Sequence, residues 1–227
     1  MVKLEGIEKN IEYTFAEKNY LIEALTHRSY LNENNHWKPN HNERLEFLGD
    51  AVLELIVTEE IYHRYPDYSE GKLTPLRAAL VNYITLAHIS KNIDLESFLL
   101  LSKGEAKESS RGREVILGNA MEALIGAIYL DGGYVAAKKF INKVVMPELQ
   151  NIFSKGSYRD AKSLLQERTQ ADHKVTPVYK VLEEKGPEHE KKFLVGVYIN
   201  SELIAQGEGF SKQEGELEAA KKAMGVI

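Results

Sequence analysis

The sequence contains no cysteine among its 227 residues, so a disulfide framework and thiol chemistry are excluded. It also lacks long hydrophobic runs: no stretch approaches the roughly 18 apolar residues of a membrane-spanning helix. Its first residues lead directly into polar sequence, without the apolar segment of a signal peptide. We therefore expect a protein with no membrane segment, located in the cytoplasm.

The chain has no excess of positive charge, since 29 Lys and Arg stand against 34 Asp and Glu. Affinity for nucleic acid comes mainly from cations that neutralise phosphates, so composition alone does not predict nucleic-acid binding. Binding remains possible because charge can be segregated into a basic patch, and because acidic residues can surround a bound cation. The length allows one large domain or two small ones.

The most informative stretch is residues 42–57, whose apolar spacing predicts a helix. Four acidic side chains fall on one stripe about 80° wide: Glu43, Glu46, Asp50 and Glu54. Apolar side chains fill most of the remaining circumference, which predicts that the helix is buried. Buried carboxylates are unfavourable unless a cation or hydrogen-bond donors compensate them. A solvated charged face is the alternative.

A second stretch, residues 115–130, also has the pattern of a buried helix. Its strongly polar side chains are Asn119 and Glu122, which lie three residues apart and therefore on one face. Two such helices predict a hard divalent cation between them. Mg²⁺ or Mn²⁺ fits a ligand set made only of oxygens. No His or Cys lies at ligand spacing, so zinc is not expected.

Three segments together resemble the family of bacterial ribonuclease III. Residues 41–53 (HNERLEFLGDAVL) are similar to its signature helix, residues 24–30 (ALTHRSY) to the block before it, and residues 122–131 (EALIGAIYLD) to the block after it. The resemblance covers essentially the whole chain in the expected order. It implies an all-α endonuclease domain at residues 1–153, followed by a linker at residues 154–158.

The spacing of apolar residues changes beyond the linker. A helix capped by Asp160, three strands (178–183, 192–199 and 203–208) and a final helix capped by Ser211 are predicted. This order resembles a double-stranded-RNA-binding domain, which gives an α+β (α-β-β-β-α) fold at residues 159–227.

That second resemblance implies contacts with RNA by shape recognition. Ser163, Gln166 and Glu167 of the first helix would reach one minor groove, and His189 of a loop would reach the next groove. Lys212, with Lys191 as a second candidate, would meet phosphate.

Two departures weaken this second match. Gln213 stands where a second lysine is usual, and Gly215 stands where the family has Ala, at about 1 kcal/mol of helix propensity. Residues 157–227 contain 11 Lys and Arg against 12 Asp and Glu, so we expect the module to bind weakly on its own.

The first resemblance implies roles in metal-dependent hydrolysis of double-stranded RNA. Glu46 and Glu122 would be ligands of Mg²⁺ (Mn²⁺ may substitute), Asp50 would position water or a second metal, and Asn119 would complete the cluster. Asp50 and Glu122 are the catalytic candidates. A homodimer is implied in which each subunit cuts one strand, leaving 5′-phosphate and 3′-hydroxyl ends, with rRNA and mRNA precursors as substrates. No small-molecule cofactor is expected.

Two further acids are candidates for auxiliary roles. Glu43 could act in the partner subunit's cleft, and Glu70 could lie beside the site or be an ordinary turn residue. The family usually has Asp where Asn119 stands. An alternative therefore remains open, a cleavage-impaired protein that binds structured RNA. A dimetal oxidase is not predicted, because the core helices lack Glu-x-x-His pairs.

Four local expectations complete the prediction. Residues 7–31 should form two helices, and a capping role is favoured for His27 over a catalytic one. Residues 73–93 should form one long helix with Pro75 in its first turn. A glycine in residues 131–134 should end the buried helix. The polar loop 102–113 should either be solvated or carry its cations to phosphates: Lys103, Lys107, Arg111 and Arg113.

Overall fold

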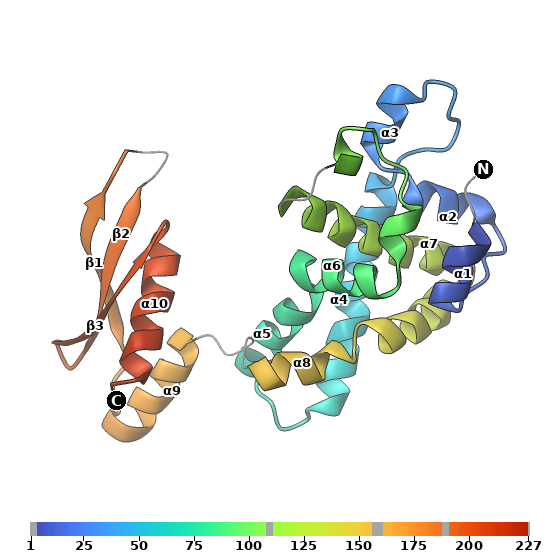
Figure 1. The fold of residues 1–227 in the computed structure, drawn as a ribbon. Helices are drawn as coiled ribbons and strands as arrows, with labels where there is room; N and C mark the ends of the chain where they lie inside the picture. Colours follow the sequence, from blue (N-terminus) through green and yellow to red (C-terminus); the bar gives the residue numbers. More distant parts are fainter. Residues whose placement is uncertain (1–3, 108–110, 156–160, 188–190, 227) are drawn as a thin grey trace. The chain divides into compact units, whose positions relative to one another are not determined.

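A computed structural model describes residues 4–107, 111–155, 161–187 and 191–226 of the chain. The chain divides into two compact units, Met1–Tyr158 and Arg159–Ile227, which are described separately below (Figure 1). The first unit is helical, and the second is a small sheet with two helices. This confirms the predicted fold class of an all-α domain followed by an α+β domain.

The first unit contains eight α-helices and two short 3₁₀ helices in its described residues. They are α1 (Leu4–Ile11), α2 (Lys18–Leu25), α3 (Arg28–Glu33), α4 (Glu43–Arg64), α5 (Glu70–Val81), α6 (Tyr83–Asn92), η1 (Leu95–Phe98), η2 (Glu105–Lys107), α7 (Arg111–Val144) and α8 (Glu148–Lys155). The N-terminal region therefore forms three helices where two were expected. His27 is the N-cap of α3 and accepts a hydrogen bond from Ser29 N at its Nδ1, which confirms the capping role.

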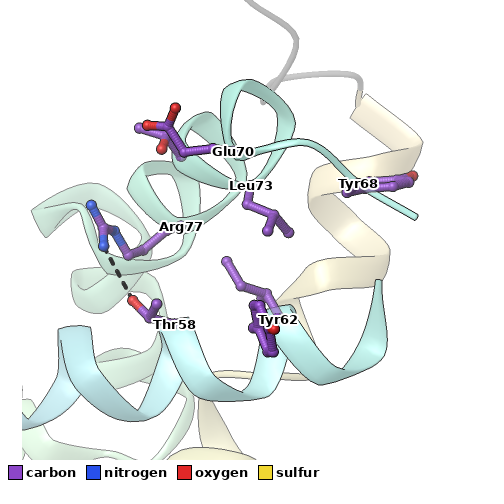
Figure 2. A pocket seen from close by; sticks show the side chains of 8 residues that line it. Thr58, Tyr62, Tyr68, Glu70, Leu73 and Arg77 are labelled. Carbon is purple, nitrogen blue, oxygen red and sulfur yellow. Dashed lines mark hydrogen bonds between the residues drawn. The ribbon is translucent and has the colours of Figure 1, made fainter. Parts of the chain in front are cut away.

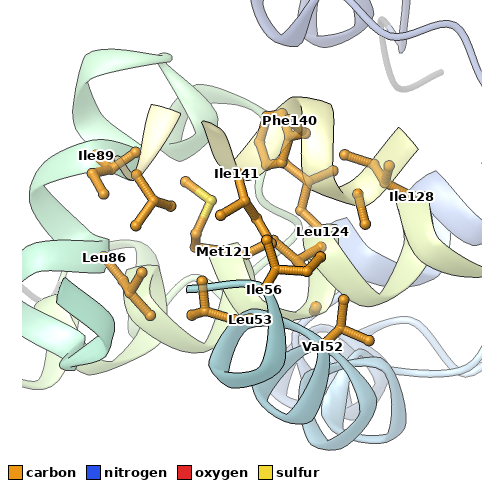
Figure 3. Packing of buried hydrophobic residues seen from close by; sticks show 14 of the residues in the cluster. Val52, Leu53, Ile56, Leu86, Ile89, Met121, Leu124, Ile128, Phe140 and Ile141 are labelled. Atoms are coloured by element: carbon orange, nitrogen blue, oxygen red, sulfur yellow. The ribbon is translucent and has the colours of Figure 1, made fainter. Parts of the chain in front are cut away.

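The core of this unit forms where α4 and α7 pack together (Figure 3). Leu53 and Ile56 of α4 meet Met121 and Leu124 of α7, and all four are fully buried. Within α7, Gly112–Val144 is long and apolar enough to cross a membrane by length and composition alone, contrary to our expectation for this sequence. In the structure 61% of its most apolar window is buried, as in the central helix of a bundle.

Asn82 divides the stretch that was predicted to be one helix over residues 73–93. Its backbone is extended, with ψ of 154°, and its Oδ1 accepts a hydrogen bond from Thr85 N at 3.0 Å as the N-cap of α6. Its Nδ2 donates to the Ala79 carbonyl at 2.9 Å at the end of α5. The single-helix prediction is therefore wrong, because one amide side chain caps both helices. Pro75 lies inside α5, which begins earlier than expected.

Gly133 interrupts α7, as the glycine pattern predicted. Its φ of 71° and ψ of −171° are not helical, so the helix changes direction there before it continues to Val144. A positive φ is accessible to glycine without the steric cost that a Cβ imposes.

The second unit is a three-stranded antiparallel sheet with strand order β1-β2-β3. Its elements are α9 (Ala161–His173), β1 (Val178–Lys185), β2 (Lys192–Ile199), β3 (Glu202–Gly209) and α10 (Lys212–Met224). Leu165 of α9 and Val197 of β2 are buried together with the alanines of α10. The predicted order of helix, three strands and helix is confirmed.

Glycines allow α10 to pack closely on the sheet. A Cβ on Gly215 would lie 2.7 Å from Val195 Cγ2, and a Cβ on Gly207 would lie 2.2 Å from Ala219 N. Gly215 therefore has a packing reason that outweighs its poor helix propensity. The predicted cap is also present, since Ser211 Oγ accepts a hydrogen bond from Glu214 N at 3.1 Å. The capping role expected of Asp160 in front of α9 lies outside the described residues.

Candidate active site

Two glycines let α4 and α7 cross at backbone contact. A Cβ on Gly49 would lie 1.7 Å from the Glu122 carbonyl oxygen, and a Cβ on Gly126 would lie 2.3 Å from the Leu45 carbonyl oxygen. Any side chain at these positions would force the helices apart. The crossing places the acidic stripe of α4 against the polar face of α7. Both glycines lie within the sequence motifs, but no local pattern indicates this role.

The side chains of Glu46, Asp50, Asn119 and Glu122 interact at this crossing, and we call them the acidic cluster. Burial raises the pKa of Glu122 to about 8, and the negative charges of Asp50 and Glu46 add to this shift. Burial also raises the pKa of Glu46, with Glu43 and Asp50 contributing in the same direction. A hydrogen bond from the Asn119 side chain to Glu46 opposes that rise. The four candidates that the sequence placed on two separate helices are therefore neighbours.

The chemistry of the acidic cluster fits a hard cation. Among the ion pairs between described residues, none includes Glu46, Asp50 or Glu122, so no cation of this described part balances these carboxylates. The donors are three carboxylates and one amide oxygen, a set that Mg²⁺ accepts. Within the described part of the chain, no three Asp, Glu, His or Cys side chains already converge as a finished metal site. The fit therefore rests on donor type, charge and partial burial.

Glu43 borders the acidic cluster without belonging to it. It is the first residue of α4, and its Oε1 accepts a hydrogen bond from Arg28 Nη1 at 3.3 Å. The ring of His41 lies 3.8 Å from its Oε2. Its charge contributes to the raised pKa of Glu46. The side chain is exposed, so it is available to other molecules.

Glu70 lies in a different place, at the start of α5, where it lines a pocket of about 450 Å³ (Figure 2). Figure 2 shows Thr58 and Tyr62 of α4 on one side and Leu73 and Arg77 of α5 on the other. Arg77 Nη1 donates a hydrogen bond to Thr58 Oγ1 at 3.2 Å. Sequence reasoning missed this pocket, because nothing local indicates which parts of α4 and α5 face each other.

The apolar side chains of α4 were expected to be buried nearly all round the helix. This expectation is wrong for a single chain. Phe47 is 82% exposed and Leu55 is 59% exposed, and Ala51 between them is exposed as well. These residues are spaced four apart and form one apolar face, which we call the Phe47 face. Its partner is not supplied by the described residues of the same chain.

Other residues singled out in the sequence serve the fold. Asp131, at the end of the third motif, accepts hydrogen bonds from Glu17 N at 2.8 Å and from the Tyr13 hydroxyl at 2.7 Å. Arg113 Nε donates to Glu96 at 2.8 Å, and its side chain is only 13% exposed. Neither interpretation offered for Arg113, solvation or phosphate contact, therefore holds. Lys103 and Lys107 are exposed, whereas the side chain of Arg111 lies outside the described residues.

In the second unit, Gln166 and Glu167 are exposed on α9 and Lys212 is exposed at the first position of α10. All three are accessible, as their predicted RNA contacts require, and the contacts themselves stay predictions. The side chain of Ser163 and the whole of His189 lie outside the described residues, so their predicted RNA contacts have no structural description here.

Comparison with known proteins agrees with both units. Residues 17–149 match the family model described as ribonuclease-III-like, and residues 161–226 match the double-stranded RNA binding motif. Ribonuclease 3 of Borreliella afzelii is 42% identical over 222 residues, which cover 98% of this chain and 90% of that protein. Ribonuclease 3 of Enterococcus faecalis is 44% identical, with coverage of 94% and 92%.

A solved structure matches the first unit. The nuclease domain of ribonuclease III from Campylobacter jejuni is 42% identical with a TM-score of 0.57, and the match covers 64% of this chain and 97% of that domain. That structure is described as showing flexibility in a region involved in dimer formation. With two family models spanning most of the chain and near full-length relatives above 40% identity, this protein belongs to the ribonuclease III family.

Proposed function

We propose that this double-stranded-RNA endoribonuclease hydrolyses the phosphodiester bonds of the RNA at the acidic cluster. One observation carries the assignment: the glycine crossing of α4 and α7 gathers Glu46, Asp50 and Glu122, and no ion pair between described residues balances them. Divalent metal use follows from membership of the family. The proposal adds that the metal is Mg²⁺, with Mn²⁺ able to substitute, because every donor is an oxygen.

Each member of the cluster has a distinct task in this proposal. Glu46, Glu122 and the amide oxygen of Asn119 would hold the ion, and Asp50, the exposed member, would orient the attacking water. A bound divalent ion supplies the positive charge that lowers the pKa of water and offsets charge that develops on phosphate. Glu122 must be ionised to serve as a ligand, so a bound cation would favour loss of its proton near neutral pH.

We propose that two subunits associate through the Phe47 face. In an isologous dimer the same patch of each subunit is buried against its partner. Phe47 of α4 is 82% exposed in the single chain, and such a contact would bury it. Glu43 then acts as an auxiliary acid near the joint cleft, whereas Glu70 lines the separate pocket between α4 and α5. Each subunit cuts one strand and leaves 5′-phosphate and 3′-hydroxyl ends. We place the enzyme in the cytoplasm, acting on rRNA and mRNA precursors.

The second unit binds double-stranded RNA in this scheme and acts as a separable module. Ser163, Gln166 and Glu167 of the first helix reach one minor groove, His189 reaches the next, and Lys212 meets phosphate. The carboxylate and amide groups read the 2′-hydroxyls that distinguish RNA from DNA.

The test is cleavage of a long RNA duplex, with the single strand of the same sequence as substrate control. The chain should cut the duplex with Mg²⁺ and not in excess chelator. Glu122→Gln should abolish cleavage and retain duplex binding in chelator, whereas Glu54→Gln, the same change on the same helix stripe outside the cluster, should leave cleavage intact.

Two outcomes would contradict the proposal. If Glu122→Gln loses duplex binding as fully as cleavage, Glu122 is structural. If the unaltered chain binds duplex RNA tightly but does not cut it with Mg²⁺ or Mn²⁺, the alternative of a cleavage-impaired RNA-binding protein holds, with Asn119 as its cause.

A further inference from the structure

One carboxylate in the second unit holds two lysines from different elements. Glu184 of β1 is the cross-strand partner of Phe193 in β2. Lys191 Nζ lies 2.6 Å from Glu184 Oε2, and Lys212 Nζ lies 3.6 Å from Glu184 Oε1. Both ammonium groups also lie 5.7 Å from the centre of the Phe193 ring. Glu184 therefore uses both of its oxygens to gather two cations over one aromatic ring.

Fold stability does not account for this arrangement. The side chains of Glu184, Lys191 and Lys212 are 35%, 40% and 60% exposed, and ion pairs this close to water contribute little to stability. Lysine ammonium groups bind phosphate as they bind carboxylate, so two of them around one pair of oxygens also suit a phosphate. Lys212 also opens α10, whose amino end favours an anion.

We propose that Glu184 occupies, in the RNA-free module, the position that an RNA phosphate takes between Lys191 and Lys212, and so lowers the affinity of the module for duplex RNA. This inference rests on the RNA-binding function proposed above. Binding exchanges the carboxylate for a phosphate, and Glu184 then lies beside that phosphate as a repelling charge. The exchange gives one residue control over how strongly the module holds its substrate.

Removing the charge at residue 184 should strengthen binding in a salt-dependent way. A unit charge about 5 Å from a phosphate in water corresponds to roughly fourfold in affinity at low salt. Neutralising about one more phosphate charge should steepen the slope of log affinity against log salt by up to about 0.9. Glu184→Gln and the unaltered chain should therefore converge at high salt.

The experiment measures binding of the full chain to an RNA duplex in chelator across a range of KCl concentrations. The matched control is Glu183→Gln, which removes the same charge from the neighbouring residue, whose ion pair is with Lys185 at 2.8 Å. We expect Glu184→Gln to bind about fourfold more tightly at low salt, with a steeper slope, and Glu183→Gln to change much less.

A second comparison separates competition from general charge. Lys212→Gln should weaken binding more in the Glu184→Gln background than in the unaltered chain, because only the unaltered chain must break the Lys212–Glu184 pair. Equal losses in the two backgrounds would overturn the inference. So would a Glu184→Gln protein that binds like Glu183→Gln or more weakly than the unaltered chain, since Glu184 would then be neutral or would position the lysines. If the unaltered chain binds no duplex at low salt, the proposed function fails as well.

Discussion

Replacement of Asn119 by Asp tests the acidic cluster most directly. In the structure the Asn119 side chain donates a hydrogen bond to Glu46 and opposes the rise of its pKa. Asn119→Asp removes this donor and adds a fourth carboxylate beside Glu46, Asp50 and Glu122. Without metal the change should destabilise the fold, and with Mg²⁺ it should strengthen metal binding.

The magnitude follows from Glu122. Its pKa rises from 4.5 to about 8, which corresponds to at most about 5 kcal/mol against the ionised form. Burial is the largest of three causes, so either neighbouring carboxylate accounts for no more than half, at most about 2 kcal/mol. One added carboxylate and one lost donor should together lower metal-free stability by about 1–2 kcal/mol at alkaline pH. Near neutral pH the loss is smaller, because Glu122 can remain protonated.

The effect on Mg²⁺ has the opposite sign. An added anion that contributes about 1 kcal/mol to metal binding lowers the Mg²⁺ concentration for half-maximal cleavage about fivefold. The assays are urea unfolding in chelator and in Mg²⁺, and a titration of duplex cleavage against Mg²⁺, for both proteins. A rate difference that persists at saturating Mg²⁺ would mean that the carboxylate also orients water. If Asn119→Asp changes neither metal-free stability nor the Mg²⁺ requirement, Asn119 does not belong to the cluster.

Four further predictions follow from the structure. Because folding raises the pKa of Glu122, its neutral form stabilises the protein at low pH. This stabilisation should be lost as pH rises from about 4.5 through about 8. The free energy of unfolding, measured with urea in chelator, should therefore depend less on pH in Glu122→Gln. The chain should have a dimeric mass by light scattering at micromolar concentration, and Phe47→Asp should give a monomer; a monomeric unaltered chain would refute the dimer. Deletion of residues 157–227 should preserve the helical fold and the dimer, weaken RNA binding and leave cleavage at low salt; unfolding of the shortened chain would show that the two units are not independent. Gly126→Ala should lower the free energy of unfolding by at least about 2 kcal/mol, since its Cβ would lie 2.3 Å from the Leu45 carbonyl oxygen. A melting temperature equal to that of the unaltered chain would show that the helix crossing can relax.

Local periodicity determined a large part of this protein. Glu46 and Asp50 share a helix face because they are four residues apart, and Asn119 and Glu122 do so because they are three apart. The three strands and the Ser211 cap were also predicted correctly, since alternation and capping depend on residues close in sequence. The family resemblance then connected the two helices to one reaction.

Tertiary structure decided which of these faces meet and which stay open. The crossing at Gly49 and Gly126 depends on two backbones that are distant in sequence, and no local pattern shows how closely they approach. Phe47 has the apolar character of a core residue, yet the single chain leaves it exposed. Arg113 and Glu184 look like ordinary surface charges until their partners, Glu96 and two lysines, are known. A sequence determines the side chains that each element presents, whereas the packing of the whole chain determines which of them become neighbours.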